Sequence, residues 1–308
     1  MGEVDVSICM VSLNCWPVLE PCLESLRAAD PAIRHEIIMV DNASTDGTVE
    51  HLVRRYPEVL VIRNSRNVGF TKATNQALAV SRGRFLLWLN TDTLVDRNFL
   101  KDLLRFLAAH PRAGIVGPKV LNPDGTFQVQ CRRGMPTPMV AVAYFLRLHK
   151  LFPRSPWAGG YLLGYLPVDQ PTEVTAVSGC CLLARREVWA EIGPLDEKIF
   201  GFGEDLDWCV RARQAGWGVW YYPGAVIVHL KGQGGAHSKP YHKAWGIHQA
   251  MWVFYRSHLQ RRYAFLVTAL VAVGIGASLG VTVARIWTMR RLRSLATAAQ
   301  LIKGDIRK

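Results

Sequence analysis

The chain has 308 residues, half of them hydrophobic, with a formal net charge of +13 and a pI near 9.7. This length and apolar content exclude a wholly disordered chain and favour one large domain, or one domain with appendages. The positive charge suits nucleic acid, an anionic membrane or phosphate-bearing ligands, and charge alone does not choose among them. Part of the excess lies at one end, because residues 285–308 hold many Arg and Lys and one acid, Asp305.

The seven cysteines include no C-x-x-C pair, and an odd number cannot all pair within the chain. We therefore expect buried thiols and a reducing compartment. The N-terminus, MGEVDVSICMVSLNCW, lacks a charged segment followed by an apolar run, which predicts that no signal peptide is cleaved. The folded part is accordingly expected in the cytoplasm.

Short apolar runs alternate with segments of helical periodicity over the first 90 residues. Strands are expected at 6–13, 36–40, 59–63 and 84–90, and helices at 18–29, 49–56 and 72–80. This alternation predicts an α/β fold with a parallel sheet covered by helices on both faces. Such sheets bind ligands beyond the carboxyl ends of their strands. Polar residues follow each expected strand: Asn14, then Asp41 and Asn42, then Asn64, then Asn90 to Asp92.

The pattern loosens at residues 134–168, which are rich in Pro, Gly and aromatic residues. We interpret this segment as an insertion or flap with an acceptor-binding or membrane-facing role, or as an ordinary hydrophobic subdomain. Regular structure is expected again over residues 174–184 and in helices at about 187–192 and 204–215.

Residues Ala264 to Ala284 form a run of 21 residues without a charge, bracketed by Arg261 and Arg262 and by Arg285. The run predicts one transmembrane helix, with a buried core helix as the alternative. Basic residues at both ends leave the orientation undetermined. Further arginines would contact anionic headgroups: Arg290, Arg291 and Arg293.

The stretch VDNASTDGT, Val40 to Thr48, ends an expected strand with Asp41 and Asn42. Asp41 is placed to accept hydrogen bonds from a nucleotide base or ribose. The same letters also suit plain turn chemistry, and Asp46 could simply cap the next helix.

A second polar group follows the expected strand in LLWLNTDTLVD, where Asn90, Thr91 and Asp92 come together. Asp92 is a hard oxygen ligand, so it could hold Mg²⁺ or Mn²⁺ together with diphosphate oxygens. The alternative is a carboxylate that only stabilises the turn at the strand end.

The stretch FGFGEDLDWCVRARQAG, from Phe200, delivers Glu204, Asp205 and Asp207 to the start of an amphipathic helix. Acids at a helix N-terminus are favoured electrostatically, and capping accounts for one or two of them. Three acids beside an aromatic loop favour a carboxylate that removes a proton from an acceptor hydroxyl.

His229 ends an expected strand in VIVHLKGQGGAH and is followed by a glycine-rich segment with Lys231 and His237. An imidazole can bind a metal, and such a segment can wrap a diphosphate. A structural hydrogen bond is the alternative for this histidine.

Taken in order, these segments resemble the family 2 glycosyltransferases, and within them the rhamnosyltransferase-like enzymes of bacterial surface polysaccharide synthesis. The resemblance covers about residues 6–237 and includes NVGFTKATN, from Asn67 to Asn75, and VSGCCLLARREVWAEIGPLDE, from Val177 to Glu197. It implies a GT-A fold, a nucleoside-diphosphate sugar donor, a divalent cation and inversion at the anomeric carbon.

The resemblance also implies residue roles. Asp205 would be the general base, with Glu204 beside it as a second catalytic residue, and Asp92 and His229 would hold the metal or diphosphate. The expected nucleotide-sugar contacts are Asn14, Asp41, Asn42, Asn67, Gly69, Phe70, Asn75, Asn90 and Thr91. Two positions depart from the family pattern: Asn90 replaces the first acid of D-x-D, and the glycine-rich stretch after His229 leaves His237 as an alternative to it.

We therefore expect a catalytic domain at residues 1–245 and a membrane-associating segment at 246–308, with a transmembrane helix at 264–284 and a basic tail. The expected reaction transfers a sugar, with dTDP-rhamnose as the leading donor and UDP- or GDP-sugars open, to a glycan or lipid-linked acceptor. The expected location is the cytoplasmic face of the membrane, single-pass or peripheral, without nucleic acid as a partner. The alternatives are a noncatalytic nucleotide-sugar-binding assembly protein, a nucleic-acid-binding protein and a sugar nucleotidyltransferase.

Overall fold

The computed structural model describes residues 4–152, 154–230 and 240–305, with side chains up to residue 292. The chain divides into two compact units, Met1–Ala236 and His237–Lys308. Lys231 and His237 lie outside the described residues, so the choice between His229 and His237 stays a prediction.

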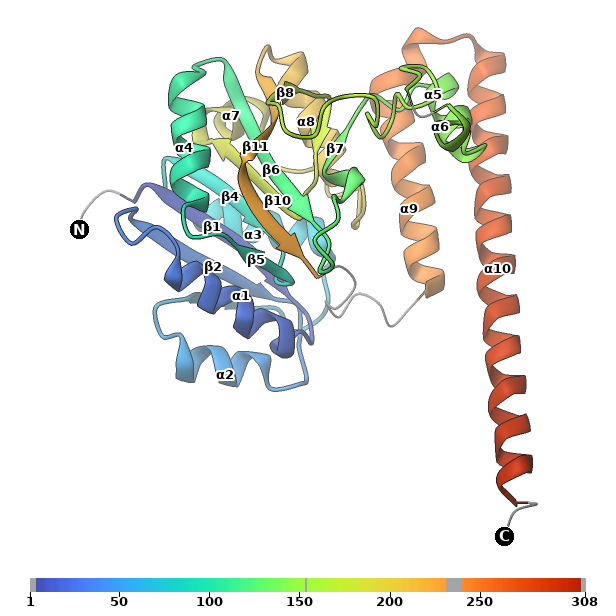
Figure 1. The fold of residues 1–308 in the computed structure, drawn as a ribbon, viewed down its shortest axis with the longest axis horizontal. Coiled ribbons are helices and arrows are strands. Elements are labelled where there is room, and N and C mark those ends of the chain that lie inside the picture. The colour runs from blue at the N-terminus through green and yellow to red at the C-terminus, as the bar shows by residue number, and fades with distance from the viewer. Residues whose placement is uncertain (1–3, 153, 231–239, 306–308) are drawn as a thin grey trace. The chain divides into compact units, whose positions relative to one another are not determined.

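The first unit is built on a nine-stranded sheet with the order β3-β2-β1-β4-β10-β6-β11-β5, and β8 pairs with β11 (Figure 1). Its strands are β1 (Val6–Ser12), β2 (His35–Asp41), β3 (Leu60–Arg63), β4 (Phe85–Leu89), β5 (Thr93–Val95), β6 (Ala113–Leu121), β8 (Thr172–Glu173), β10 (Cys181–Arg185) and β11 (Gly218–His229). A separate two-stranded sheet pairs β7 (Arg132–Arg133) with β9 (Ala176–Val177).

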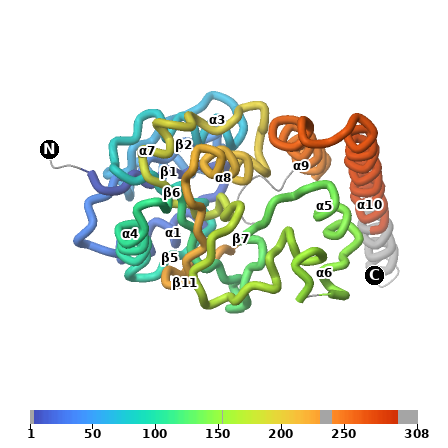
Figure 2. The backbone as a smooth tube through the Cα atoms, turned by 90° about the horizontal axis from the view of Figure 1, so that it is seen from above, coloured from blue at the N-terminus to red at the C-terminus, as the bar shows by residue number. Residues whose placement is uncertain are grey.

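Helices cover both faces of the large sheet. The helices of the first unit are α1 (Trp16–Ala28), α2 (Thr48–Arg55), α3 (Phe70–Val80), α4 (Phe99–Ala109), α5 (Pro138–Phe145), α6 (Leu148–Leu151), α7 (Arg186–Ile192) and α8 (Glu204–Gln214), with a 3₁₀ turn η1 (Val129–Cys131). Helices α1 and α4 lie on one face, and α3, α7 and α8 on the other (Figures 1 and 2). Because the central strands are covered on both sides, β1 and β4 are buried along almost their whole length.

The sheet is parallel in its first half and mixed in its second. Strands β2 and β4 both pair parallel with β1, and β3 pairs parallel with β2, as the alternating pattern predicts. Strand β10 then runs antiparallel between β4 and β6. The parallel arrangement predicted from the first 90 residues holds for β1 to β4, and the antiparallel β10, which follows a turn rather than a crossover helix, lies beyond that segment.

Strand β11 has partners on both sides. It runs parallel to β6 and antiparallel to β5, and this second register places His229 opposite Thr93. The ordered stretch expected at 174–184 contains two strands, β9 and β10, because the main chain turns at Ser178, whose carbonyl accepts from the Cys181 amide. A Cβ on Gly179 would lie 2.9 Å from the Trp88 ring and 3.1 Å from the Asp205 Cβ, so this turn packs tightly between β4 and α8.

Residues 134–152 and 154–168 form α5, α6 and a series of turns in the first unit. Arg132, just before the segment, is buried, and its guanidinium donates hydrogen bonds of 2.6 Å to the carbonyls of Leu166 and Pro167. One arginine thus ties the end of the segment back to its beginning.

The second unit contains α9 (Pro240–Phe254), a π-helical turn η3 (Tyr255–Leu259), a 3₁₀ turn η4 (Gln260–Arg262) and α10 (Phe265–Asp305). His248 of α9 lies 3.0 Å from the Ser278 hydroxyl of α10, and Tyr255 lies 3.0 Å from the Thr268 hydroxyl. These contacts hold the two helices together within the unit.

Helix α10 contains the expected hydrophobic run. Residues Phe265–Leu292 have a mean hydropathy of 2.2, and none of the most apolar window is buried. This window is exposed in the described residues, and by length and composition the helix could cross a membrane. All seven cysteines are free and buried, as expected.

Candidate active site

The carboxyl ends of β1 and β2 are joined by hydrogen bonds around Asp41. Its carboxylate accepts from the Ser12 hydroxyl and from the Ser44 amide, both at 2.9 Å. Asn14, with a φ of +48°, accepts from the Thr45 amide at 2.7 Å. The loop after β2 is therefore held in one shape, with Asp41 buried beneath it.

The same loop is linked to the start of α3. The Asn42 amide donates to the Gly69 carbonyl at 3.2 Å and accepts from Asn64 at 3.0 Å. Asn67 accepts from the Gly69 amide at 2.9 Å. Two of the predicted segments, VDNASTDGT and NVGF, thus form one hydrogen-bonded edge.

Gly69 also brings a distant segment to this edge. Its φ is +94°, and a Cβ there would lie 2.7 Å from the ring of Phe200. The Phe70 amide donates to the Phe200 carbonyl at 3.0 Å. Only glycine fits such a backbone and such an approach, so Gly69 allows the loop that precedes α8 to pack here.

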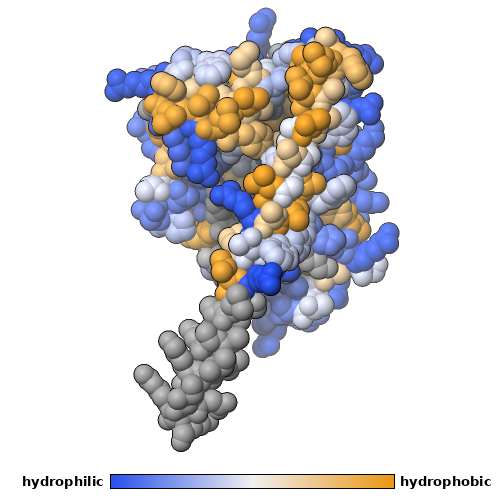
Figure 3. Space-filling model, turned by 90° about the vertical axis from the view of Figure 1, so that its right-hand side faces the viewer, coloured by the Kyte–Doolittle hydropathy of each residue, from blue (hydrophilic) through white to orange (hydrophobic). Residues whose placement is uncertain are grey.

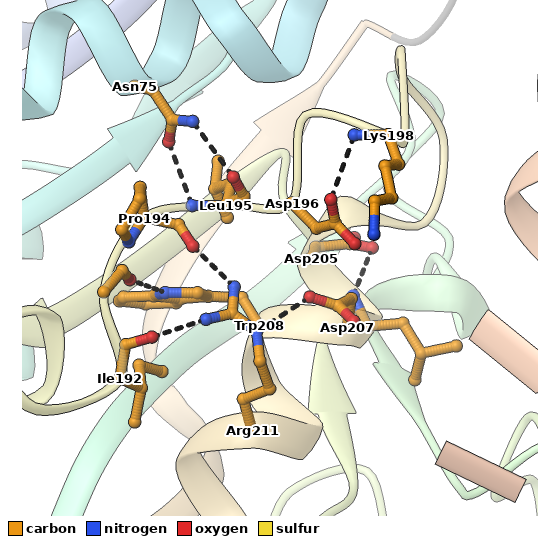
Figure 4. Close-up of polar contacts among 12 residues, drawn as sticks. Asn75, Ile192, Pro194, Leu195, Asp196, Lys198, Asp205, Asp207, Trp208 and Arg211 are labelled. Atoms are coloured by element: carbon orange, nitrogen blue, oxygen red, sulfur yellow. Dashed lines mark hydrogen bonds and ion pairs between the residues drawn. The ribbon is translucent and has the colours of Figure 1, made fainter. Parts of the chain in front are cut away.

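Asn75 is buried and forms hydrogen bonds within the fold rather than at the hydrogen-bonded edge of the sheet. Its side chain donates to the Leu195 carbonyl and accepts from the Leu195 amide, both at 3.0 Å (Figure 4). It also donates to the Glu197 carboxylate at 3.1 Å. The residue positions the loop between α7 and α8, and its contact with a nucleotide sugar stays a prediction.

Asp92 and His229 meet at the ends of β4 and β11. The antiparallel pairing of β11 with β5 brings the imidazole Nε2 to 3.2 Å from the Asp92 carboxylate, and both side chains are largely buried. The His229 Nδ1 lies 2.9 Å from the Gln128 side-chain oxygen. Burial acts to lower the pKa of His229, but hydrogen bonds to Asp92 and to the Cys180 sulfur raise that pKa to about 10.

Asn90 and Thr91 lie next to this pair. The Asn90 amide donates to the Cys180 carbonyl at 2.9 Å, and its carbonyl accepts from the Thr93 hydroxyl at 2.8 Å. Thr91 is buried against the Cys15 thiol. The turn at Gly179 and Cys180 therefore contacts His229 through Cys180 and Asp205 through Gly179.

The side chains of Asp92 and His229 supply part of the ligand set that a divalent cation needs. Within the described ranges no group of three or more His, Cys, Asp and Glu side chains is placed to hold a metal ion. One carboxylate and one imidazole remain, and Mn²⁺ accepts both kinds of ligand. Diphosphate oxygens and water would complete the coordination.

Asp205 is buried at the start of α8 in an ion pair with Arg133. The Arg133 guanidinium and the Gly179 amide donate to one carboxylate oxygen at 2.6 and 2.7 Å, and the Leu206 amide donates to the other at 2.7 Å. Burial acts to lower the pKa of Arg133, but the Asp205 charge raises it above its usual range. The second oxygen keeps a lone pair for a hydroxyl proton.

Glu204 differs from its neighbour. Burial, with the nearby Asp205 charge, raises the pKa of Glu204 to about 8. Its Oε2 is buried without a hydrogen-bond partner in the described structure. A carboxyl that is protonated at neutral pH donates a hydrogen bond rather than taking a proton.

Asp207 has a structural role. It forms an ion pair with Arg211 at 2.9 Å, and Arg211 also donates to the carbonyls of Ile192 and Pro194 (Figure 4). The three acids of α8 are thus distinct: one is paired with Arg133, one has a pKa raised by burial, and one anchors the helix to the loop after α7.

Two residues at the site were not predicted from the sequence. Arg133 lies 72 positions before its partner Asp205, and Gln128 lies 101 positions before His229. The one sequence signal for Arg133 is the pair of arginines that immediately precedes the loosened segment at 134–168.

Residues 7–193 match the model of glycosyl transferase family 2. The chain belongs to this family. This glycosyltransferase is 31% identical over 256 residues to the N-acetylglucosaminyl-diphospho-decaprenol L-rhamnosyltransferase of Mycobacterium tuberculosis, over 79% of this chain and 81% of the relative. It is 27% identical to the O-antigen biosynthesis protein RfbC of Myxococcus xanthus, over 70% of this chain and 16% of that protein.

Solved structures agree on the fold of this family 2 glycosyltransferase. The crystal structure of Staphylococcus aureus TarS superposes with a TM-score of 0.57 at 17% identity, over 88% of this chain and 43% of that one. GalNAc-T7 with UDP, GalNAc and Mn²⁺ superposes with a TM-score of 0.55 at 19% identity, over 82% of this chain and 50% of that one. The GT-A fold and the assignment as a glycosyltransferase enzyme are confirmed.

Proposed function

We propose that this enzyme transfers a sugar with inversion from a nucleoside-diphosphate donor to a hydroxyl of a lipid-linked acceptor, with dTDP-rhamnose as the leading donor. The observation that carries the proposal is Asp205, buried at the start of α8 and paired with Arg133. The turn at Gly179 and Cys180 connects it to the Asp92 and His229 pair. A proton acceptor and a diphosphate-binding pair beside one strand end suit glycosyl transfer.

The donor and acceptor are supported by the mycobacterial relative. Its name specifies an L-rhamnosyl transfer and a diphospho-decaprenol-linked acceptor, and the two proteins match over most of both lengths. The edge formed by Asp41, Asn42 and Gly69 supports nucleotide binding, because its loops are already ordered by their own hydrogen bonds.

In this mechanism Asp205 takes the acceptor hydroxyl proton through the oxygen that is bonded to the Leu206 amide. The hydroxyl oxygen attacks the anomeric carbon from the face opposite the diphosphate, in a single displacement that inverts that carbon. Arg133 keeps the base oriented, and the raised pKa of Glu204 leaves Asp205 as the carboxylate of this pair that takes the proton.

Asp92 and His229 would hold a divalent cation, for which Mn²⁺ is our first candidate. When bound, such an ion neutralises negative charge on the departing diphosphate. The Mn²⁺ in the GalNAc-T7 structure supports a cation in an enzyme of the same fold.

The Asp205→Asn variant tests the assignment of the base. We expect nucleotide binding to be retained and transfer to fall by about 10²- to 10⁴-fold, the usual contribution of a general base. Binding is measured by calorimetry and transfer by nucleoside-diphosphate release. Asp169→Asn, at an exposed acid paired with Lys119, is the matched control. Normal turnover by Asp205→Asn would show that Asp205 is not the general base.

A donor panel tests the substrate. Full-length protein with Mn²⁺ or Mg²⁺ is incubated with dTDP-rhamnose, UDP-sugars and GDP-sugars in the presence of a polyprenyl-diphosphate-linked acceptor. We expect the fastest nucleotide release with dTDP-rhamnose. A clear preference for a UDP- or GDP-sugar would replace the donor and leave the reaction class in place.

We further propose that the α5–α6 surface, defined as residues 138–152 and 154–157, lies on the cytoplasmic face of the membrane. Among its exposed residues are Met139, Phe145, Leu146, Leu151, Phe152 and Trp157. Figure 3 shows orange hydrophobic surface beside blue hydrophilic residues. Residues 134–168 contain no Asp or Glu, and Arg147, Lys150 and Arg154 are exposed. Exposed apolar side chains interleaved with cations suit insertion into an anionic lipid interface.

The Phe152→Glu variant tests this surface with two acceptors. Transfer to a membrane-embedded acceptor should fall, while transfer to a water-soluble acceptor analogue should be unchanged, because the substitution puts a charge where lipid would lie. Val53→Glu, at an exposed residue of α2, is the control. Equal losses with both acceptors, or no loss with either, would contradict the membrane contact.

A further inference from the structure

A line of hydrogen bonds connects a surface turn to His229. The Thr126 hydroxyl contacts the Asp124 carboxylate at 2.6 Å, and the Asn122 amide nitrogen contacts that hydroxyl at 2.9 Å. The Gln128 amide nitrogen lies 3.0 Å from the Asn122 side-chain oxygen. The Gln128 oxygen then lies 2.9 Å from His229 Nδ1. We name these four side chains before the histidine the relay.

The Asp124 carboxylate, at the surface end of the relay, determines which group donates and which accepts in each hydrogen bond. An ionised carboxylate only accepts, so the Thr126 hydroxyl must donate its single hydrogen to Asp124. The hydroxyl oxygen then accepts from the Asn122 amide nitrogen. This turns the Asn122 oxygen toward Gln128, whose own nitrogen must donate. The Gln128 oxygen therefore faces His229 and can only accept.

The reverse direction is excluded by the same carboxylate. If both amides were turned over, the Asn122 oxygen would need the Thr126 hydrogen. Asp124 and Thr126 would then face each other at 2.6 Å with no hydrogen between their oxygens. Two facing acceptors at that distance repel, so one direction is strongly preferred.

The turn that carries the relay is rigid. The Gly125 amide donates to the Asn122 carbonyl at 2.9 Å, the Asn122 amide donates to the Thr126 carbonyl at 2.8 Å, and Gly125 has a φ of +80°. The Gln128 amide donates to the Val120 carbonyl at 2.9 Å, and its side chain is buried. Each relay side chain thus starts from a fixed backbone.

We propose that the relay keeps a hydrogen on Nδ1 of His229, so that Nε2, which contacts Asp92 in this structure, is the ring nitrogen that gives up its hydrogen and binds a divalent cation. Gln128 is then a positioning residue, and Asp124 sets its orientation from the surface. The inference rests on the proposed function. A partner that fixes the tautomer of a ligating histidine commonly changes metal affinity by about 10- to 100-fold when it is removed.

The first test compares two substitutions at Thr126, which is exposed. Thr126→Val removes the hydroxyl that sets the direction, whereas Thr126→Ser retains it. Mn²⁺ alone is titrated into full-length protein, and free Mn²⁺ is measured by electron paramagnetic resonance. We expect several-fold weaker binding for the Val variant and wild-type binding for the Ser variant. Equal affinities for the two variants would overturn the relay.

The second test acts at the inner end. Gln128→Leu removes the acceptor for Nδ1–H, and we expect about 10-fold weaker Mn²⁺ binding or more. Gln128→Glu keeps an acceptor oxygen and should bind better than the Leu variant. Pulsed resonance should show an imidazole nitrogen on Mn²⁺ in wild type and lose it in His229→Gln. A wild-type spectrum without that nitrogen would overturn the proposal.

These measurements are separate from catalysis. If wild type turns over sugar donors while the Val and Ser variants bind Mn²⁺ equally, the relay fails and the proposed function stands. If wild type turns over no donor, the proposed function fails, and the ordering of Mn²⁺ affinities still decides the relay. Thermal unfolding of each variant checks that a change in affinity is not a change in folding.

Discussion

The two halves of the sheet edge use their polar residues differently. At the ends of β1 and β2, the side chains of Asn14, Asp41 and Asn42 are hydrogen-bonded to neighbouring loops. At the ends of β4 and β11 and the start of α8, buried charges pair with each other, and Glu204 carries an unpartnered oxygen. The hydrogen-bonded loops of the first half suit substrate binding, and the second half contains the ionisable groups that proton transfer and diphosphate binding require.

The largest effect on stability should come from breaking the ion pair at Asp205. Arg133→Met leaves a buried carboxylate without its partner, which should cost about 3–5 kcal/mol of unfolding free energy. Thermal and denaturant unfolding measure the loss. The double variant Arg133→Met with Asp205→Asn should recover stability without recovering transfer. A double variant no more stable than Arg133→Met would show that the charge is not the cause.

Gly69→Ala should give the next largest effect, because it combines a strained backbone with a clash against Phe200. We expect a loss of about 1–3 kcal/mol and weaker nucleotide binding. Gly193→Ala is the matched control for backbone strain, since Gly193 has a φ of +74° and no atom lies within 4 Å of an added Cβ. If both variants lose the same stability, the approach of Phe200 contributes nothing.

Glu204 should make stability depend on pH. Its pKa in the folded chain is raised to about 8 from an ordinary value of 4.5, so the folded state holds its proton more tightly than the unfolded state. This contribution is fully present below pH 4.5 and is lost as pH rises through 8. Glu204→Gln removes it, so its melting temperature relative to wild type should rise between pH 5 and pH 9, by about 2–4 °C for each kcal/mol. A constant difference across that range would contradict the raised pKa.

The smallest effect is expected at Asp207. Asp207→Asn weakens its pairing with Arg211, and we expect a loss of about 1 kcal/mol with transfer per folded molecule unchanged. Unfolding and nucleotide-release assays on the same preparation separate the two quantities. A large fall in turnover would place this third acid in the chemistry and remove the distinction among the acids of α8.

The parallel half of the fold was predictable from the sequence because its signals are local. The expected strands and helices up to residue 90 agree with β1 to β4 and α1 to α3 within about two residues at each end. The antiparallel placement of β10 was not predictable, because apolar periodicity carries no strand direction. The break at Ser178 depends on how closely Gly179 approaches Trp88, which is a tertiary contact.

By itself the sequence determined which residues follow the strands, the three acids at the start of α8, the apolar run of α10 and the family resemblance. Only the tertiary structure decided which of them meet. It paired Asp92 with His229, gave Asp205 its partner Arg133, and buried Glu204. The reason is physical: strand order and loop packing bring together charges far apart in the chain, and the protonation of each depends on its neighbours and burial rather than on adjacent letters.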